Sequence, residues 1–168
     1  MSFKQPAVIG AGVMGEAMIS ALLRVGYEPA AIKIREKRAE RSQELVEKYG
    51  IGTDSILGSD LILLAVKPQD VEETLKSLSG EISKSALLVS LCAGVKSKMI
   101  ESLVDSSVRV VRVMPNTPLL ISNGMSAVAG GSRATYEDLK WVEKLLTGSG
   151  KVLVVEAVSY THLTLPTI

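Results

Sequence analysis

The residues best suited to chemistry stand near the start of the chain, in the run Val8-Ile9-Gly10-Ala11-Gly12-Val13-Met14-Gly15. Gly10 permits a tight turn, Gly12 has no Cβ to keep a pyrophosphate from the backbone, and Gly15 lets a helix pack close to a strand. The free N–H groups of the first helical turn then face the phosphates, and the helix dipole favours the anion. The run therefore predicts a dinucleotide site that is built from residues 10–15.

The surroundings of this run strengthen a motif that is weak on its own. A bare G-x-G-x-x-G also describes a glycine turn that binds no ligand. Here residues 3–9 form an apolar strand pattern directly before the glycines. One apolar helical face follows, and Gly26 suits its end. A strand, a glycine turn and a helix in this order favour nucleotide binding.

Charged residues follow the second expected strand, about 20 residues after the glycines, where a site of this kind holds the adenosine ribose. Glu36 can accept hydrogen bonds from the ribose hydroxyls, which favours NAD. Arg35, Lys37 and Arg38 can pair with a 2′-phosphate, which favours NADP. A solvated charge cluster at a helix start is the third interpretation. The three basic residues favour NADP slightly.

Small and polar residues follow the third long strand. The segment that could lie against the cofactor is Ala65-Val66-Lys67-Pro68. Lys67 can contact a phosphate or the substrate, although an ordinary loop lysine is the preferred interpretation. The next strand ends in Cys92-Ala93-Gly94, whose small side chains let the chain pass close to a flat ring. Cys92 is expected to be a buried filler and not a nucleophile.

A stiff segment follows the next strand, with the sequence Met114-Pro115-Asn116-Thr117-Pro118. Two prolines three residues apart restrict the backbone around one amide side chain. Asn116 can bond the nicotinamide amide or the substrate, or it can satisfy its own backbone. Asn116 is the nearest candidate for a catalytic residue, and no residue is assigned that role. No metal site is predicted.

Strands and helices alternate along the chain, which predicts a mostly parallel, doubly wound, Rossmann-like sheet with helices on both faces. Ligands of such sheets bind beyond the carboxyl ends of the strands. The expected strands cover residues 3–9, 30–36, 61–66, 87–91, 109–114, 125–129 and 152–155, with a short one near 51–53. The expected helices follow Gly15, Ala39 and Pro68, begin at a Ser97 cap, and span 136–147 with capping-box spacing between Thr135 and Asp138.

Composition excludes several classes of protein. The chain has 168 residues, of which 46% are hydrophobic and 22% are charged, as in ordinary globular domains. A net charge of +1 gives no field that favours nucleic acid or a membrane surface. A single cysteine excludes an internal disulfide and fits a reducing, cytoplasmic location. No signal peptide and no apolar run of about 18 residues are present, so no membrane association is expected.

Three segments in this order resemble pyrroline-5-carboxylate reductase. They are Gly10-Ala11-Gly12-Val13-Met14-Gly15, Ala65-Val66-Lys67-Pro68-Gln69 and Val111-Arg112-Val113-Met114-Pro115-Asn116-Thr117-Pro118. The segments Ser90-Leu91-Cys92-Ala93-Gly94-Val95 and Asn123-Gly124-Met125 are similar to further parts of the family. The resemblance covers about residues 3–157, and the last of the three segments is its most specific part.

The resemblance implies hydride transfer from NADPH or NADH to the C=N carbon of 1-pyrroline-5-carboxylate, which gives L-proline. It places residues 10–15 on the pyrophosphate, 35–38 at the ribose end, and 65–68 and 92–94 along the nicotinamide half. Asn116 would lie nearest the reacting ring. Val13 departs from the asparagine of many members, which removes one polar contact. The family is usually cytoplasmic in bacteria and forms homo-oligomers.

The sequence departs from the family most at its end. Family members carry a second, helical domain that forms the dimer and supplies most of the substrate carboxylate site. Residues 1–157 are expected to form the NAD(P)-binding domain. Residues 158–168, which include His162, resemble a translated sequencing adapter and are expected to be a non-native tail.

We therefore expect a fragment that binds cofactor weakly, turns over little or no substrate, and exposes an apolar surface prone to aggregation. Two other functions remain open from the residues. One is another Rossmann reductase of the β-hydroxyacid or prephenate dehydrogenase type, and the other is a non-catalytic NAD(P)-binding regulator.

Overall fold

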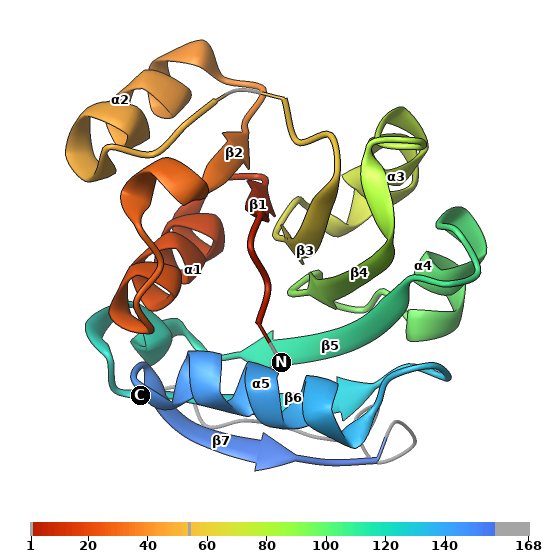
Figure 1. Ribbon diagram of the computed structural model, residues 1–168. Coiled ribbons are helices and arrows are strands. Elements are labelled where there is room, and N and C mark those ends of the chain that lie inside the picture. Colours follow the sequence, from red (N-terminus) through yellow and green to blue (C-terminus); the bar gives the residue numbers. More distant parts are fainter. Residues whose placement is uncertain (1, 54, 157–168) are drawn as a thin grey trace.

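The computed structural model describes residues 2–53 and 55–156, and these form one seven-stranded sheet (Figure 1). The strands are β1 (Pro6–Ile9), β2 (Lys33–Arg35), β3 (Ser59–Leu64), β4 (Ile82–Ser90), β5 (Arg109–Pro115), β6 (Gly124–Gly130) and β7 (Gly150–Val154). Their order across the sheet is β2-β1-β3-β4-β5-β6-β7. Neighbours from β2 to β5 are parallel, β6 runs antiparallel to β5, and β7 is parallel to β6. The mostly parallel Rossmann-like sheet is thus confirmed.

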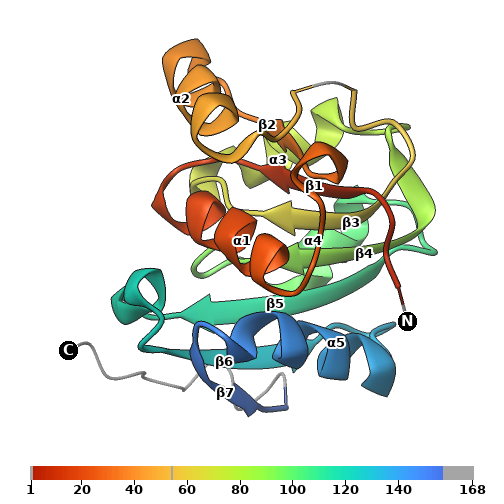
Figure 2. The same cartoon turned by 60° about the vertical axis from the view of Figure 1, so that its left-hand side comes forward.

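Helices cover both faces of the sheet (Figure 2). They are α1 (Val13–Arg24), α2 (Ala39–Tyr49), α3 (Val71–Ser77), α4 (Ser97–Leu103) and α5 (Tyr136–Thr147). Leu22 of α1, Leu45 of α2 and Leu145 of α5 belong to one hydrophobic core. Leu75 of α3 and Ile100 of α4 belong to the core on the other face. The sheet is therefore covered on both faces, which explains why its central strands are continuously apolar.

The register of the parallel strands aligns the carboxyl ends of β1, β2, β3 and β4, whereas β5 continues for three more residues. Ile9 of β1 pairs with Arg35 of β2 and Leu64 of β3, and Leu64 pairs with Ser90 of β4, which pairs with Arg112 of β5. The segments that follow these residues therefore lie along one edge of the sheet. This is the edge at which ligands bind in doubly wound sheets.

Local signals placed one helix boundary well and another poorly. The predicted helix 136–147 matches α5, and Thr135 and Asp138 form the expected capping box. The predicted Ser97 cap is wrong, because Lys96 has the extended backbone of a cap residue and Ser97 is already helical. Pro68 begins a 3-10 turn, η2 (Pro68–Asp70), and α3 follows directly.

Two short elements differ from the simple strand pattern. The segment before β2 forms a 3-10 turn, η1 (Pro29–Ala31), so the strand begins at Lys33 and not at residue 30. The expected strand near residues 51–53 is a single bridge between Gly52 and Lys33. A third 3-10 segment, η3 (Thr117–Ile121), joins β5 to β6. The predicted tail 158–168, with His162, lies outside the described residues.

Candidate functional site

The three glycines between β1 and α1 have different surroundings. Gly10 has a φ of +82°, and a Cβ added there would lie 2.8 Å from Val66 Cγ1. A Cβ on Gly15 would overlap the Gly10 carbonyl oxygen, so only a glycine at position 15 lets α1 pack this close to the turn. A Cβ on Gly12 would meet nothing within 4 Å, and the φ of Gly12 is −70°. The fold therefore requires glycine at positions 10 and 15 but not at position 12.

The start of α1 presents backbone amides to this region. Gly12 is the cap residue, and it makes no side-chain hydrogen bond to the first N–H groups of the helix. The first N–H groups of a helix have no acceptor within the helix, and the positive end of the dipole lies there. Val13, in the first turn, is 58% exposed. This helix start can therefore hold an anion such as a pyrophosphate.

A cleft of about 540 Å³ opens beside the turn, at the carboxyl ends of β1, β2 and β3. Eight of its lining residues come from the predicted set: Gly10, Gly12, Arg35, Glu36, Lys37, Ala65, Val66 and Lys67. Ile9 and Arg38 line it as well. The structure thus brings the glycine turn, the segment after β2 and the segment after β3 together in one cleft.

Four further lining residues were not predicted. They are Asp70 of η2 and Glu73, Thr74 and Ser77 of α3. They come from the segment that follows β3 and form a wall of the cleft with residues 65–67. The signal in the sequence was Pro68, because a helix that begins directly after a strand must lie beside the end of that strand. Asp70, Glu73, Thr74 and Ser77 have the i, i+3, i+4, i+7 spacing of one helix face, which could have identified this wall from the sequence.

Arg35 is already paired in the structure. Its guanidinium donates to both carboxylate oxygens of Glu81, at 2.9 and 2.7 Å. These hydrogen bonds raise the pKa of Arg35 and lower the pKa of Glu81. The pair joins the end of β2 to the turn after α3, so Arg35 serves first as part of the wall of the cleft.

Glu36 contacts the glycine turn itself. Its Oε2 accepts the N–H of Ala11 at 2.8 Å, and its Oε1 accepts the N–H of Arg38 at 3.0 Å and the Nε of Arg38 at 3.2 Å. Burial raises the pKa of Glu36, but the hydrogen bonds from Arg38 and Ala11 outweigh burial and leave the pKa below its ordinary value. The carboxylate is therefore ionised, and Arg38 balances much of its charge.

Two lysines stand on opposite sides of the cleft. Lys37 follows β2 and Lys67 follows β3, and both are exposed. Neither forms an ion pair with any residue in the described ranges. These two ammonium groups are therefore the cations of the predicted set that are best placed to meet a phosphate of a bound ligand.

The segment after β4 lies outside the lining of the cleft. Ala93 and Gly94 are exposed, whereas Cys92 is buried. The thiol of Cys92 donates to the carbonyl oxygens of Val66 at 3.3 Å and Leu64 at 3.6 Å. Burial raises the pKa of this thiol, which keeps it protonated and makes it a poor nucleophile. Cys92 is thus a small side chain that packs behind the cleft.

Asn116 also lies outside the lining of the cleft, at the end of β5. Its N–H donates to the Met125 carbonyl at 3.1 Å, and its Oδ1 accepts the Met125 N–H at 2.8 Å. The side chain thus extends the pairing of β5 with β6 by one residue. This bond goes to the backbone of the neighbouring strand and not to that of Asn116 itself, and a contact of Asn116 to cofactor or substrate stays a prediction.

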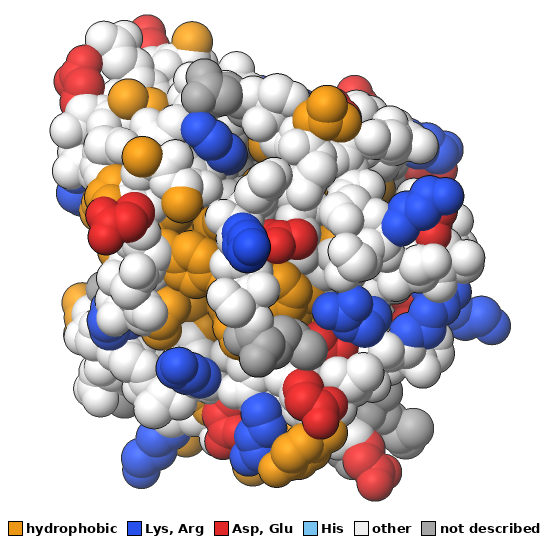
Figure 3. Space-filling model, in the orientation of Figure 1, with side chains coloured by type: hydrophobic (Ala, Val, Ile, Leu, Met, Phe, Trp, Pro, Cys, Tyr) orange, Lys and Arg blue, Asp and Glu red, His pale blue; other side chains and the backbone are white. Residues whose placement is uncertain are grey.

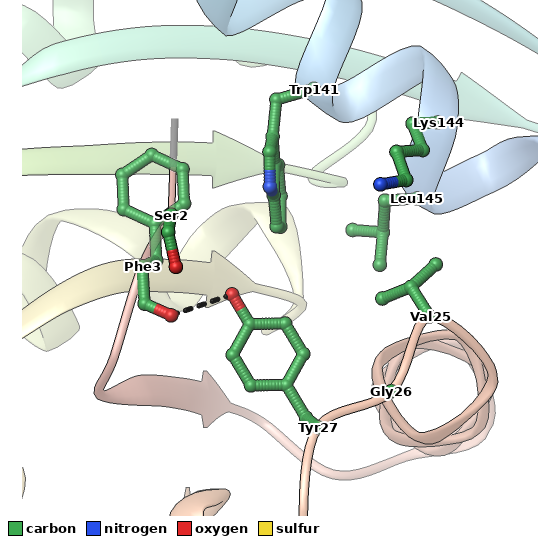
Figure 4. A pocket seen from close by; sticks show the side chains of 8 residues that line it. All are labelled: Ser2, Phe3, Val25, Gly26, Tyr27, Trp141, Lys144 and Leu145. Atoms are coloured by element: carbon green, nitrogen blue, oxygen red, sulfur yellow. Dashed lines mark hydrogen bonds between the residues drawn. The ribbon is translucent and has the colours of Figure 1, made fainter.

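A second, smaller cavity of about 250 Å³ lies between the start of the chain, the end of α1 and α5 (Figure 4). Tyr27 donates its hydroxyl to the Phe3 carbonyl at 2.9 Å, and the rings of Phe3 and Trp141 meet edge to face with centroids 4.9 Å apart. Hydrophobic side chains are visible near the start of the chain on this face (Figure 3). The cavity contains none of the predicted residues, and its contacts join the N-terminal segment to α5.

The described residues contain neither a metal-binding cluster nor a membrane-spanning helix. No group of three or more His, Cys, Asp or Glu side chains is arranged to hold a metal ion. None of the helices within residues 2–53 and 55–156 has the length and hydropathy of a membrane span. The cleft beside the glycine turn is the candidate site, because eight of the predicted residues line it.

Comparison with known proteins shows which family the chain belongs to. Residues 6–94 match the family described as "NADP oxidoreductase coenzyme F420-dependent". The pyrroline-5-carboxylate reductase of Corynebacterium melassecola is 37% identical over 157 residues, which cover 89% of this chain and 58% of that protein. The chain therefore spans less than two thirds of the length of this curated relative.

Solved structures show the same fold. A pyrroline-5-carboxylate reductase from Coxiella burnetii superposes with a TM-score of 0.80 at 28% identity, over 92% of this chain and 59% of that one. A Plasmodium falciparum pyrroline carboxylate reductase, solved with NADP bound, has a TM-score of 0.75 at 22% identity, over 93% and 59% of the two chains. The chain therefore belongs to the NADP oxidoreductase, coenzyme F420-dependent family and corresponds to the N-terminal NAD(P)-binding domain of pyrroline-5-carboxylate reductases.

Proposed function

We propose that this chain is the cofactor-binding part of an enzyme that reduces the C=N bond of 1-pyrroline-5-carboxylate to L-proline with NADPH or NADH. The surroundings of Gly12 are the observation that most directly supports a cofactor site at this turn. Gly12 has an ordinary backbone and open space where its Cβ would stand, so neither backbone strain nor a clash inside the protein requires a glycine there. A ligand phosphate that approaches this backbone would explain it.

The positions of the other residues support a division of the cofactor between two regions. The amides at the start of α1 would hold the pyrophosphate. The cleft between the segment after β2 and α3 would hold the adenosine half. The nicotinamide half would then extend along the sheet edge, past Ala65–Pro68 toward Cys92–Gly94 and Asn116. This order follows the strand order, because β3, β4 and β5 are neighbours.

The described residues would act by binding and orientation. When bound, the reduced nicotinamide supplies the hydride, and the protein positions two planar partners and limits the access of water. The exposed Ala93 and Gly94 leave room on the expected path of the ring, and the buried Cys92 packs behind them. No described side chain is assigned as a proton donor for the imine nitrogen. The relatives' further length is the natural source of that group and of a site for the substrate carboxylate.

NADPH is the preferred cofactor in this proposal. The charge of Glu36 is balanced by Arg38, and Glu36 is held by Ala11, so it is not directed at the cleft as an uncompensated anion. Lys37 and Lys67 provide positive charge on the two sides of the cleft. We propose further that the enzyme is cytoplasmic and that it forms homo-oligomers through the part that corresponds to the relatives' further length.

Titration of the chain with NADPH and NADH tests the cofactor site, and addition of 1-pyrroline-5-carboxylate to the bound NADPH tests the chemistry. We expect saturable binding with NADPH tighter than NADH, and slow oxidation that depends on 1-pyrroline-5-carboxylate. Prephenate and β-hydroxyacids, offered with the oxidised cofactor, serve as controls and are expected to give no reduction. Reduction of the cofactor by either control substrate would contradict the proposed substrate. NADPH binding with no oxidation by 1-pyrroline-5-carboxylate, in a full-length protein that also carries the relatives' further length, would favour a non-catalytic nucleotide-binding protein.

A further inference from the structure

One peptide unit of the glycine turn is held from outside by α2. Arg41, in the first turn of α2, donates its Nε–H to the carbonyl oxygen of Ala11 at 2.9 Å. On the other side of the same residue, the N–H of Ala11 donates to Glu36 at 2.8 Å. Ala11 is buried, so both of its backbone polar groups need such partners. The turn between β1 and α1 is thus fixed by side chains that come from residues 36–41.

Arg41 is itself held in place. Its guanidinium also donates to Glu16 of α1 and to Glu44 of α2, the latter at 2.9 Å. The side chain is only 17% exposed. Glu16 in turn accepts from Lys48 at 2.8 Å and from the Tyr49 hydroxyl at 2.8 Å. A planar guanidinium with three acceptors in fixed places has little freedom to rotate.

The bond from Arg41 determines where the next amide points. The carbonyl oxygen of Ala11 and the N–H of Gly12 belong to one peptide unit, and no cis peptide occurs among the described residues. In a trans peptide these two groups point in opposite directions. The Ala11 carbonyl points toward α2, so the Gly12 N–H points away from α2. Gly12 lines the cleft and Arg41 does not, so Arg41 can influence a ligand there only through the backbone.

We propose that Arg41 is a positioning residue for the cofactor pyrophosphate. By holding the Ala11 carbonyl, it keeps the Gly12 amide turned to the side of the cleft and removes the alternative, rotated state of the Ala11–Gly12 peptide. Glycine at position 12 makes this control necessary, because glycine resists rotation of its backbone less than other residues do. The inference rests on the proposed function, since it requires a pyrophosphate at this turn.

Arg41→Met tests the inference, with Lys48→Met as the matched control. Both variants remove one cation from the group around Glu16, but only Arg41 touches the turn. Affinity is measured for NADPH, which contains the pyrophosphate, and for adenosine 2′-monophosphate, which shares only the adenosine end. The backbone amide resonance of Gly12 is recorded without ligand, and circular dichroism reports folding.

In Arg41→Met we expect NADPH to bind about tenfold more weakly, because one charge-assisted hydrogen bond no longer orients the amide. Adenosine 2′-monophosphate should bind within about twofold of the wild type, and the Gly12 amide resonance should shift. Lys48→Met should leave both affinities within about twofold. If Arg41→Met does not fold, Arg41→Lys replaces it, because a lysine keeps the charge near Glu16 but lacks the planar fork.

Other results would overturn either the role of Arg41 or the proposed function. Unchanged NADPH affinity in the Arg41 variant would overturn the inference, as would equal losses in the Arg41 and Lys48 variants. A loss for adenosine 2′-monophosphate as large as that for NADPH would show general destabilisation and would also overturn it. Failure of the wild-type chain to bind NADPH at all would instead overturn the proposed function.

Discussion

Arg35 and Glu81 form a two-point ion pair between the end of β2 and the turn after α3, with N–O distances of 2.9 and 2.7 Å. The basic residues near the cleft therefore differ in whether they already have a carboxylate partner. Arg35 and Arg38 already have carboxylate partners, whereas Lys37 has no ion pair among the residues that the structure describes. Lys37 is therefore better placed than Arg35 to recognise the 2′-phosphate that distinguishes NADPH from NADH.

Substitution of these two residues should have different effects on cofactor choice. Lys37→Ala should weaken NADPH about tenfold and change NADH by less than about twofold, because only NADPH carries the 2′-phosphate. Arg35→Ala should weaken both cofactors to a similar degree, because it releases Glu81 and loosens the wall of the cleft. The ratio of the two dissociation constants measures both effects. A selective loss of NADPH in Arg35→Ala would show that Arg35 leaves Glu81 to bind the phosphate.

Glu16 should make the protein sensitive to acid. Burial raises the pKa of Glu16, but hydrogen bonds from Lys48, Arg41 and Tyr49 outweigh burial and lower the pKa from 4.5 to about 2. A carboxyl with a lowered pKa in the folded state stabilises that state above pH 4.5, and the contribution disappears as the pH falls toward 2. The free energy of unfolding of the wild type should therefore exceed that of Glu16→Gln at pH 7, and the difference should shrink below pH 4.5.

Denaturant titrations of both proteins at several pH values provide this comparison. Glu44→Gln is the control, because Glu44 also bonds Arg41 but its side chain is 58% exposed. The control should change stability by less than about 0.5 kcal/mol. A gap between wild type and Glu16→Gln that stays constant from pH 7 to pH 2 would rule out the assigned role of Glu16.

Ser126 should be a site where a smaller side chain stabilises the protein. Ser126 is fully buried in β6, and its hydroxyl has no hydrogen-bond partner among the described residues. Ser126→Ala should raise the free energy of unfolding by about 1 kcal/mol, because it removes the cost of burying an unpaired hydroxyl. Ser90→Ala is the matched control, since Ser90 is 1% exposed and its hydroxyl accepts the Cys92 N–H at 3.3 Å. Ser90→Ala should lower stability, and the same sign for both variants would contradict this explanation.

Asp138 should be the most important acidic residue of α5 for stability. It is fully buried, and its carboxylate accepts the Nε–H of Arg109 at 2.9 Å and the N–H of Thr135 at 2.9 Å. Asp138→Ala should lower the free energy of unfolding by about 3–5 kcal/mol, because it removes one of the two hydrogen bonds of the capping box and leaves Arg109 without its buried carboxylate partner. Glu137→Gln, at the exposed neighbouring position, should change stability by less than about 0.5 kcal/mol. Similar losses in the two variants would argue against the buried pair.

The fold could be predicted largely from the sequence because its signals are local and strong. Leu61–Leu64 are continuously apolar and fully buried, and the Thr135–Asp138 capping box places the start of α5 correctly. The Ser97 cap was mispredicted because a serine is also acceptable as the first residue of a helix, and the backbone of Lys96 determined the boundary.

The site was harder to predict, because its side-chain partners come from distant parts of the sequence. The glycine turn and its neighbours at 35–37 and 65–67 were identified, since strand ends meet at one edge of a parallel sheet. The partner of Arg35 is Glu81, which lies 46 positions away, and no local pattern connects them. The bond between Arg41 and Ala11 likewise depends on how α2 packs against α1.

The most direct test of the central claim compares NADPH binding by the wild type and by Gly12→Ala, with thermal unfolding of both proteins as the control. The fold leaves room for a Cβ at this position, and alanine is only a somewhat poorer cap residue than glycine, so the two unfolding temperatures should lie within a few degrees. If a pyrophosphate lies against Gly12, the added methyl group should weaken NADPH about tenfold or more. Equal affinity in two equally stable proteins would show that the dinucleotide does not bind at the glycine turn.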